Sequence, residues 1–133
     1  MKQQIGEALL GKRSGKSVYV PDQGDIIWID FDPQAGHEQF GHRPAIVISP
    51  MIYNKLPSGL AIVCPITSKV KGYPFEVALC KGMKTEGAVL SDQIKSIDWR
   101  VREAKFIEKA SPSILSEIVA KLAPLFPIQF PIQ

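Results

Sequence analysis

Short apolar segments separated by turns run through the middle of the chain and constrain its fold more than any other feature. They cover residues 25–31, 44–49, 60–66, 75–79 and 87–96. Most are short runs rich in β-branched or aromatic residues, and the last has polar residues toward its end; each predicts a β-strand. Their spacing lacks the helical crossovers of a parallel sheet. We therefore expect a mainly β protein with some helix (α+β), built on a small antiparallel sheet or barrel.

One longer helix is predicted near the end of the chain. Ser111 is placed to cap it and Pro112 suits the first helical position, while Pro124 should end it. The apolar residues between these signals recur at three- and four-residue spacing, at 114, 115, 118, 119 and 122. We expect this stripe to pack on the sheet rather than form a groove for a partner. A second, very short helix is predicted to follow Ser49, which would cap it, and to run through Asn54.

The chain has 133 residues, enough for one compact domain. We expect a flexible basic tail at 1–18, the domain at 19–126, and an extended appendage at 127–133 that contains a repeated Pro-Ile-Gln. The net charge of +3 comes from the first twenty residues and the rest of the chain is balanced, so total charge says little about nucleic acid.

Two isolated cysteines exclude a disulfide framework and a paired-cysteine metal site. No apolar run approaches the roughly 20 residues of a membrane-spanning helix, and we do not expect the first residues to form a secretory signal, because Glu7 interrupts their short apolar stretch. We therefore expect a soluble, cytoplasmic protein without membrane association.

The polar segment 32–43 is predicted to be a loop, and it gathers Glu38, Gln39, His42 and Arg43 just before an apolar strand. An arginine at such a position suits bidentate phosphate binding, because its planar fork matches two phosphate oxygens; a surface ion pair is the alternative. His37 and His42 would form an acid–base pair for RNA cleavage, or would simply be exposed. Cys64, inside an apolar strand, is expected to be a buried structural thiol.

Several ordered motifs between Tyr19 and Leu125 resemble the MazF/PemK family of toxin endoribonucleases. They are Tyr-Val-Pro-Asp-x-Gly-Asp-x-Ile-Trp at 19–28, Phe-Asp-Pro at 31–33, Gly-His-Glu-Gln-x-Gly-His-Arg-Pro-Ala at 36–45, Pro-Ile-Thr-Ser at 65–68, Lys-Gly-Tyr-Pro-Phe-Glu-Val at 71–77, and Asp-Gln-Ile-Lys-Ser-Ile-Asp-Trp-Arg at 92–100. The resemblance implies the SH3-like antiparallel fold shared with the gyrase poison CcdB, closed by a C-terminal helix. It also implies a homodimer, no metal or other cofactor, and neutralisation by a MazE-like antitoxin.

The implied activity is cleavage of single-stranded mRNA at short sequences, which leaves a 2′,3′-cyclic phosphate and a 5′-hydroxyl. The family's functional arginine, threonine and loop glutamate fall on Arg43, Thr67 and Glu38. On this interpretation Arg43 stabilises the phosphate, Thr67 adds a hydrogen bond, and Glu38 is the base for the 2′-hydroxyl. His42 is our hypothesis for an auxiliary proton donor. The candidate RNA contacts, each with a solvated or core side chain as the plainer alternative, are Phe31, Gln39, His42, Ser68, Lys71, Asp92, Gln93 and Lys95.

Two other functions remain open on the same sequence. One is a non-catalytic, CcdB-like poison that binds DNA gyrase, and the other is a plain RNA-binding module. Neither needs the set of Glu38, Arg43 and Thr67. That set therefore favours the nuclease.

Overall fold

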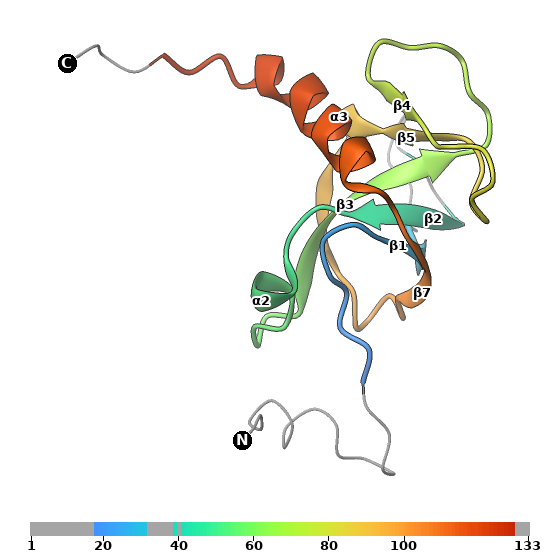
Figure 1. Cartoon of the computed structure of the whole chain (residues 1–133). Coiled ribbons are helices and arrows are strands. Elements are labelled where there is room, and N and C mark those ends of the chain that lie inside the picture. The colour runs from blue at the N-terminus through green and yellow to red at the C-terminus, as the bar shows by residue number, and fades with distance from the viewer. Residues whose placement is uncertain (1–17, 32–38, 40, 130–133) are drawn as a thin grey trace.

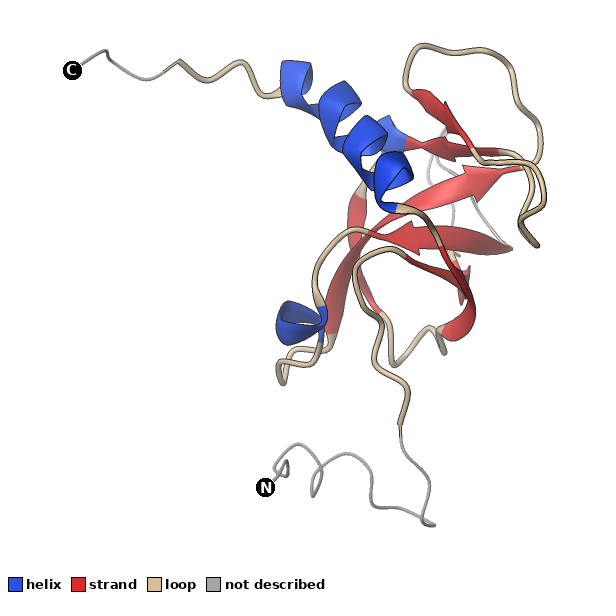
Figure 2. Ribbon diagram, in the orientation of Figure 1, coloured by secondary structure: helices blue, strands red, loops and turns tan. Residues whose placement is uncertain are grey.

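Seven antiparallel strands and one long helix form the computed structural model, which describes residues 18–31, 39 and 41–129 (Figures 1 and 2). The strands are β1 (Asp25–Asp30), β2 (His42–Val47), β3 (Leu60–Thr67), β4 (Glu76–Ala78), β5 (Ala88–Leu90), β6 (Lys95–Asp98) and β7 (Lys105–Lys109). The helices are α2 (Met51–Asn54) and α3 (Pro112–Leu122), with 3-10 turns η2 (Ser91–Gln93) and η3 (Ala123–Leu125). This confirms the predicted antiparallel α+β fold with a C-terminal helix. Within the described ranges, no helix is long and apolar enough to cross a membrane.

Strand β3 is the centre of the sheet because it pairs with three strands. The order is β4-β5-β3-β2-β1-β7, and β6 also pairs with β3. Val63 pairs with Lys95 and Ile66 pairs with Val89. The paired residues are thus three positions apart in β3 but six positions apart in the segment that contains β5 and β6. The extra residues form η2. The single strand predicted over 87–96 is therefore two strands separated by a turn.

Pro65 explains this interruption. Ile62 directs its carbonyl oxygen to Ile48 on the β2 side, so the residue three positions on faces the opposite edge of β3. Proline has no N–H to give to a ladder, and the partner segment leaves the sheet at that point. The resulting turn stands beside Pro65 rather than hydrogen-bonded to it.

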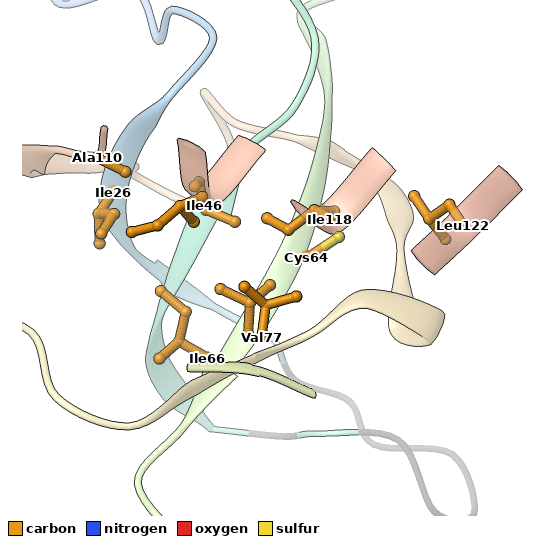
Figure 3. Close-up of a cluster of buried hydrophobic side chains, with 10 residues drawn as sticks. Ile26, Ile46, Cys64, Ile66, Val77, Ala110, Ile118 and Leu122 are labelled. Atoms are coloured by element: carbon orange, nitrogen blue, oxygen red, sulfur yellow. The ribbon is translucent and has the colours of Figure 1, made fainter. Parts of the chain in front are cut away.

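The sheet buries apolar side chains on both faces, in two clusters. On one face, which we call the helix face, strand residues pack against α3 and β4 (Figure 3); this cluster includes Ile26, Ile46, Cys64, Ile66, Val77, Ile114, Ile118 and Leu122. The cluster on the other face, which we call the inner face, comprises Ile27, Ile29, Phe31, Ala45, Val47, Ala61, Val63, Ile97 and Trp99. Strand β2 contributes to both clusters, so its apolar run is buried on both sides. In α3 only part of the predicted stripe packs inward, because Val119 is exposed.

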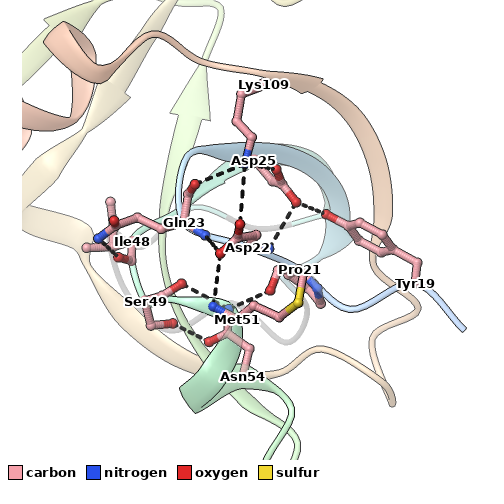
Figure 4. A network of polar contacts seen from close by, with 10 residues as sticks. All are labelled: Tyr19, Pro21, Asp22, Gln23, Asp25, Ile48, Ser49, Met51, Asn54 and Lys109. Carbon is pink, nitrogen blue, oxygen red and sulfur yellow. Dashed lines mark hydrogen bonds and ion pairs between the residues drawn. The ribbon is translucent and has the colours of Figure 1, made fainter. Parts of the chain in front are cut away.

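A polar network anchors the segment before β1 (Figure 4). The buried Asp25 carboxylate accepts hydrogen bonds from the Tyr19 hydroxyl at 2.5 Å and the Asp22 N–H at 2.9 Å, and its other oxygen lies 2.8 Å from Lys109 Nζ. Because a buried carboxylate without partners would be costly, these three contacts fix the chain entry to the end of β7. Beside them, the fully buried Asn54 donates to the carbonyl oxygens of Pro21 and Ser49, at 2.8 and 2.9 Å.

Local details differ from the sequence-based expectations at three places. Ser49 does not cap α2; its hydroxyl donates to Asn54 Oδ1, and Pro50 occupies the cap position. Ser111 stands at the cap of α3 without a side-chain capping bond, and its hydroxyl contacts that of Ser113 instead. Strand β7 was not predicted, because three of its five residues are charged, as is common on an edge strand.

Candidate functional site

Arg43 and Thr67 lie at the same end of two paired strands. In the β2–β3 ladder Ala45 pairs with Pro65, and continuing that register by two residues on each strand sets Arg43 opposite Thr67. Arg43 also pairs with Ile29 of β1, an inner-face residue, so both side chains belong to that face. The loop was expected to extend through residue 43, but strand β2 already begins at His42. Arg43 is half-buried, and Thr67 is 6% exposed.

The Thr67 hydroxyl is oriented by its own turn. The Lys69 N–H donates to Thr67 Oγ1 at 3.0 Å. Because the hydroxyl oxygen acts as acceptor in that bond, the hydroxyl proton can be donated to another group. An oxygen of a bound phosphate is a suitable acceptor for it.

A small pocket lies on the same inner face, beside Pro65. It has a volume of about 170 Å³ and is lined by Phe31, Gln39, Pro65, Asp92, Gln93, Ile94 and Lys95. Pro65 is two residues before Thr67 and therefore on the same face, and Lys95 pairs with Val63 of that face. The Gln93 side chain accepts a hydrogen bond from the Gln39 N–H at 3.0 Å, which ties the segment before β2 to η2. The structure thus brings Gln39, Asp92, Gln93 and Lys95 together.

Phe31 contributes to this pocket as core rather than as an open ring. Its side chain is only 2% exposed, and Lys95 Nζ lies 5.8 Å from the ring centroid, within cation–π range. A base cannot stack on a ring whose faces are already covered. The stacking role expected for Phe31 is therefore not supported, and the alternative of a core position holds.

His42 and Ser68 point away from the Arg43 side. Neighbouring residues in a strand alternate between faces, so His42 lies on the face opposite Arg43. Its ring contacts the Trp28 indole, with centroids 5.0 Å apart and planes at 73°. Ser68 lines a separate pocket together with Trp28. The structure therefore does not place His42 beside Arg43 as a proton donor, nor Ser68 beside Thr67 as a helper.

Three further residues singled out in the sequence stand apart from the pocket or from the described chain. Lys71 is exposed and does not line the pocket; its N–H donates to the Glu76 carboxylate, and its ammonium group lies 5.7 Å from the Tyr73 ring centroid. Glu38 and His37 lie outside the described residues.

Cys64, on the helix face, is fully buried, as expected. Desolvation, and secondarily the charge of Asp92, raises the pKa of its thiol to about 12. Its Sγ lies 3.7 Å from the Ser91 carbonyl oxygen. The thiol is thus structural and stays protonated.

Sequence reasoning missed two residues that shape the site. Pro65 breaks the ladder and so creates η2, which supplies Asp92 and Gln93. Gly87, at φ +116°, allows β5 to approach the carbonyl of Thr67. The sequence did contain a signal for each: Pro65 stands inside an apolar strand, and Gly87 stands directly before β5.

The structure is thus a small antiparallel sheet closed by a helix, with an arginine and a threonine on the face that also carries the pocket. Residues 22–126 match the family model described as PemK-like, MazF-like toxin of type II toxin–antitoxin systems. The chain therefore belongs to this family, and the resemblance drawn from its motifs is confirmed.

Individual relatives are similar over nearly their whole length. The chain is 51% identical to the endoribonuclease toxin MazF of Escherichia coli K12 over 106 residues, which cover 80% of this chain and 94% of that protein. A crystal structure of MazF from Deinococcus radiodurans matches with a TM-score of 0.79 and 47% identity, covering 84% of this chain and all of that one. A MazE–MazF structure from the same organism matches with a TM-score of 0.75 and 46% identity, with the same coverage.

Proposed function

We propose that this chain is an endoribonuclease toxin that cuts single-stranded mRNA. The observation that carries the proposal is the placement of Arg43 and Thr67 on the inner face, which also carries the pocket lined by Gln39, Asp92, Gln93 and Lys95. Its support from relatives is the 51% identity to a protein named an endoribonuclease toxin. A fold-level likeness alone would not separate a nuclease from a gyrase poison.

The chemistry needs few groups, because the ribose 2′-hydroxyl is an internal nucleophile held near the phosphorus. Its oxygen attacks the phosphorus, the bond to the 5′-oxygen breaks, and the products are a 2′,3′-cyclic phosphate and a 5′-hydroxyl. The 2′-hydroxyl loses a proton and the departing 5′-oxygen gains one. The Arg43 guanidinium acts as an electrostatic clamp on the non-bridging oxygens, and Thr67 donates a hydrogen bond to the same group. Glu38 takes the 2′-hydroxyl proton; this assignment rests on the family resemblance.

The substrate is single-stranded for a geometric reason. Within an A-form duplex the bases are paired and the deep major groove is closed to side chains, whereas a single strand can be splayed and read on its base edges. Gln39, Asp92 and Gln93 supply donors and acceptors for such readout, and Lys95 supplies a phosphate contact. Lys71, an exposed cation in the loop between β3 and β4, adds a second contact with the RNA backbone.

The partners belong to the same proposal: a homodimer in the cytoplasm, with a MazE-like antitoxin. The similar Deinococcus radiodurans structure is a MazE–MazF complex, and a disordered acidic segment would compete with RNA for the charges of Arg43, Lys71 and Lys95. Inhibition by such a segment should weaken as salt rises.

Incubation of the purified protein with a long single-stranded RNA in excess EDTA tests the proposal. We expect discrete fragments whose 3′ ends are cyclic phosphates by mass spectrometry, and the fragment ends then give the recognition sequence. The Arg43→Ala protein should leave the RNA intact. RNA that stays intact with the parent protein too would favour the gyrase poison, which inhibition of DNA supercoiling would then establish.

A further inference from the structure

A second pocket lies on the helix face, at the same end of the sheet as Arg43. It has a volume of about 390 Å³, within the range of small-ligand sites, and is lined by Trp28, Pro44, Ser68, Lys84, Thr85, Glu86 and Ile107. Pro44 pairs with Trp28 across β1 and β2, and Ser68 directly follows Thr67. We call it the Trp28 pocket. The proposed cleavage reaction makes no use of it.

The Trp28 pocket presents a fixed aromatic surface. Trp28 is 39% exposed, although the residues on either side of it in β1 are fully buried. The edge-on contact with His42 sets the orientation of the indole. An exposed indole at the mouth of a pocket offers a planar partner for stacking.

Glu108 of β7 holds in place the turn that forms one wall of the pocket. Its carboxylate accepts the N–H of Lys84 at 3.1 Å and that of Thr85 at 2.7 Å, which fixes the 84–86 turn to the sheet. Desolvation raises the pKa of Glu108, but these hydrogen bonds outweigh it and the pKa lies below its ordinary value. The turn carries an exposed ammonium group on Lys84 and an exposed carboxylate on Glu86. A planar ring, hydrogen-bonding groups at its edge and a cation together match a nucleotide: base, base edge and phosphate.

Position along the strands connects this pocket to the cleavage site. Arg43 and Thr67 are on the inner face, and the residues adjacent to them in sequence, His42 and Ser68, are on the helix face. A layer packed on either face of a sheet lies about 10 Å from it, whereas successive phosphates of a strand are at least about 3.4 Å apart. A few nucleotides therefore suffice to pass around the ends of β2 and β3.

We propose that the Trp28 pocket binds a nucleotide flanking the cut site of the single-stranded RNA, with its base stacked on Trp28 and its phosphate on Lys84. The inference rests on the proposed function, since the same strand is held at Arg43. The pocket lengthens the RNA footprint beyond the reacting phosphate. It contributes to binding and takes no part in the chemistry.

Tryptophan fluorescence gives a direct test. Trp99 is 3% exposed and its indole N–H is bonded to the Asn54 carbonyl oxygen, so quenching by a ligand reports Trp28. The probes are two RNAs with 2′-deoxyribose at the cut nucleotide, one with both flanks and one trimmed to the nucleotides around the cut. We expect the flanked RNA to quench the emission and the trimmed RNA not to do so.

Matched variants then measure the contribution to affinity. Trp28→Leu should weaken binding of the flanked RNA by about tenfold or more, Trp28→Phe should retain most of it, and neither should change binding of the trimmed RNA. Lys84→Gln should lower the salt slope for the flanked RNA by about one. Phe106→Leu removes an exposed aromatic side chain that lines neither pocket, and should bind like the parent.

The outcomes separate this inference from the proposed nuclease. If Trp28→Leu binds both RNAs as the parent does while cleavage persists, the pocket proposal fails and the nuclease stands. If RNA is never cut but flanked RNA still quenches Trp28 emission, the nuclease fails and the nucleotide site stands. If polyglutamate quenches the emission and RNA does not, the pocket is a site for acidic peptide and the nucleotide proposal is overturned.

Discussion

Gly87 lies directly against the backbone of Thr67, so that a Cβ built on Gly87 would fall 1.9 Å from the Thr67 carbonyl oxygen. This glycine has φ +116°, a conformation that other residues rarely adopt. The contact joins the start of β5 to the end of β3, where Thr67, the residue proposed to bind the RNA phosphate, is located. The position of Thr67 thus depends on a residue with no side chain.

Gly87→Ala should therefore destabilise the protein by about 2–4 kcal/mol and impair RNA cleavage, because the new methyl group must displace the Thr67 backbone. Urea unfolding and a cleavage assay measure the two effects. Gly82→Ala is the matched control: Gly82 also has positive φ but nothing lies within 4 Å of its added Cβ, so a cost of only about 1 kcal/mol is expected. Equal costs for both variants would show that the close approach to Thr67 is unimportant.

Arg43→Ala should reduce the single-turnover cleavage rate by about 10²–10³-fold or more, as expected when a group that stabilises developing charge is removed. Arg43→Lys should recover little of this, because the planar fork is lost although the charge is kept. Arg100→Ala removes an equal charge from a residue stacked on Trp99 and should leave the rate unchanged. Near-normal cleavage by Arg43→Lys would mean that charge alone is sufficient.

His42→Ala should retain the single-turnover rate on the trimmed ribonucleotide substrate within a few fold. The reason is geometric, since the His42 ring packs on Trp28 on the face opposite Arg43. The measurement is the pH profile of that rate with and without the imidazole. A large loss, together with the disappearance of a limb of the profile near the pKa of histidine, would restore His42 as the proton donor.

The two thiols should differ sharply in reactivity. Cys80 is exposed, whereas burial, with a smaller effect of Asp92, raises the pKa of Cys64 to about 12. Since the thiolate is the reactive form, a disulfide reagent at about pH 8 should modify one thiol per folded chain. Cys80→Ser should abolish this reaction until denaturant is added. Two fast-reacting thiols in the folded parent would contradict the packing at Cys64.

Tyr19 should make the protein lose stability in alkali. Burial, followed by the hydrogen bond to Asp25 and that residue's charge, raises the pKa of the Tyr19 phenol far above its ordinary value of 10.0. The unfolded chain releases this proton near pH 10 and the folded chain does not, so the free energy of unfolding falls as pH rises above about 10. Urea unfolding from neutral pH to about pH 11 measures the slope, which should be smaller in Tyr19→Phe.

The strands at 25–31 and 60–66 could be predicted from the sequence because their patterns are local: β-branched residues in short runs are sufficient. Arg43 and Thr67 could be selected because ordered motifs surround them. Strand β7 could not, because a charged edge strand resembles a loop until its partner β1 is known.

Which residue types occur, and in what order, determined the family, the antiparallel sheet and the arginine and threonine expected to act on RNA. Only the tertiary structure decided which side of the sheet each candidate faces. Starting β2 at His42 separates the imidazole from Arg43, and the missing N–H of Pro65 forces out the turn that carries Asp92 and Gln93. The physical reason is that side chains alternate along a strand, so the start of β2 at His42 instead of Pro44 sends the side chains of His42 and Arg43 to opposite faces.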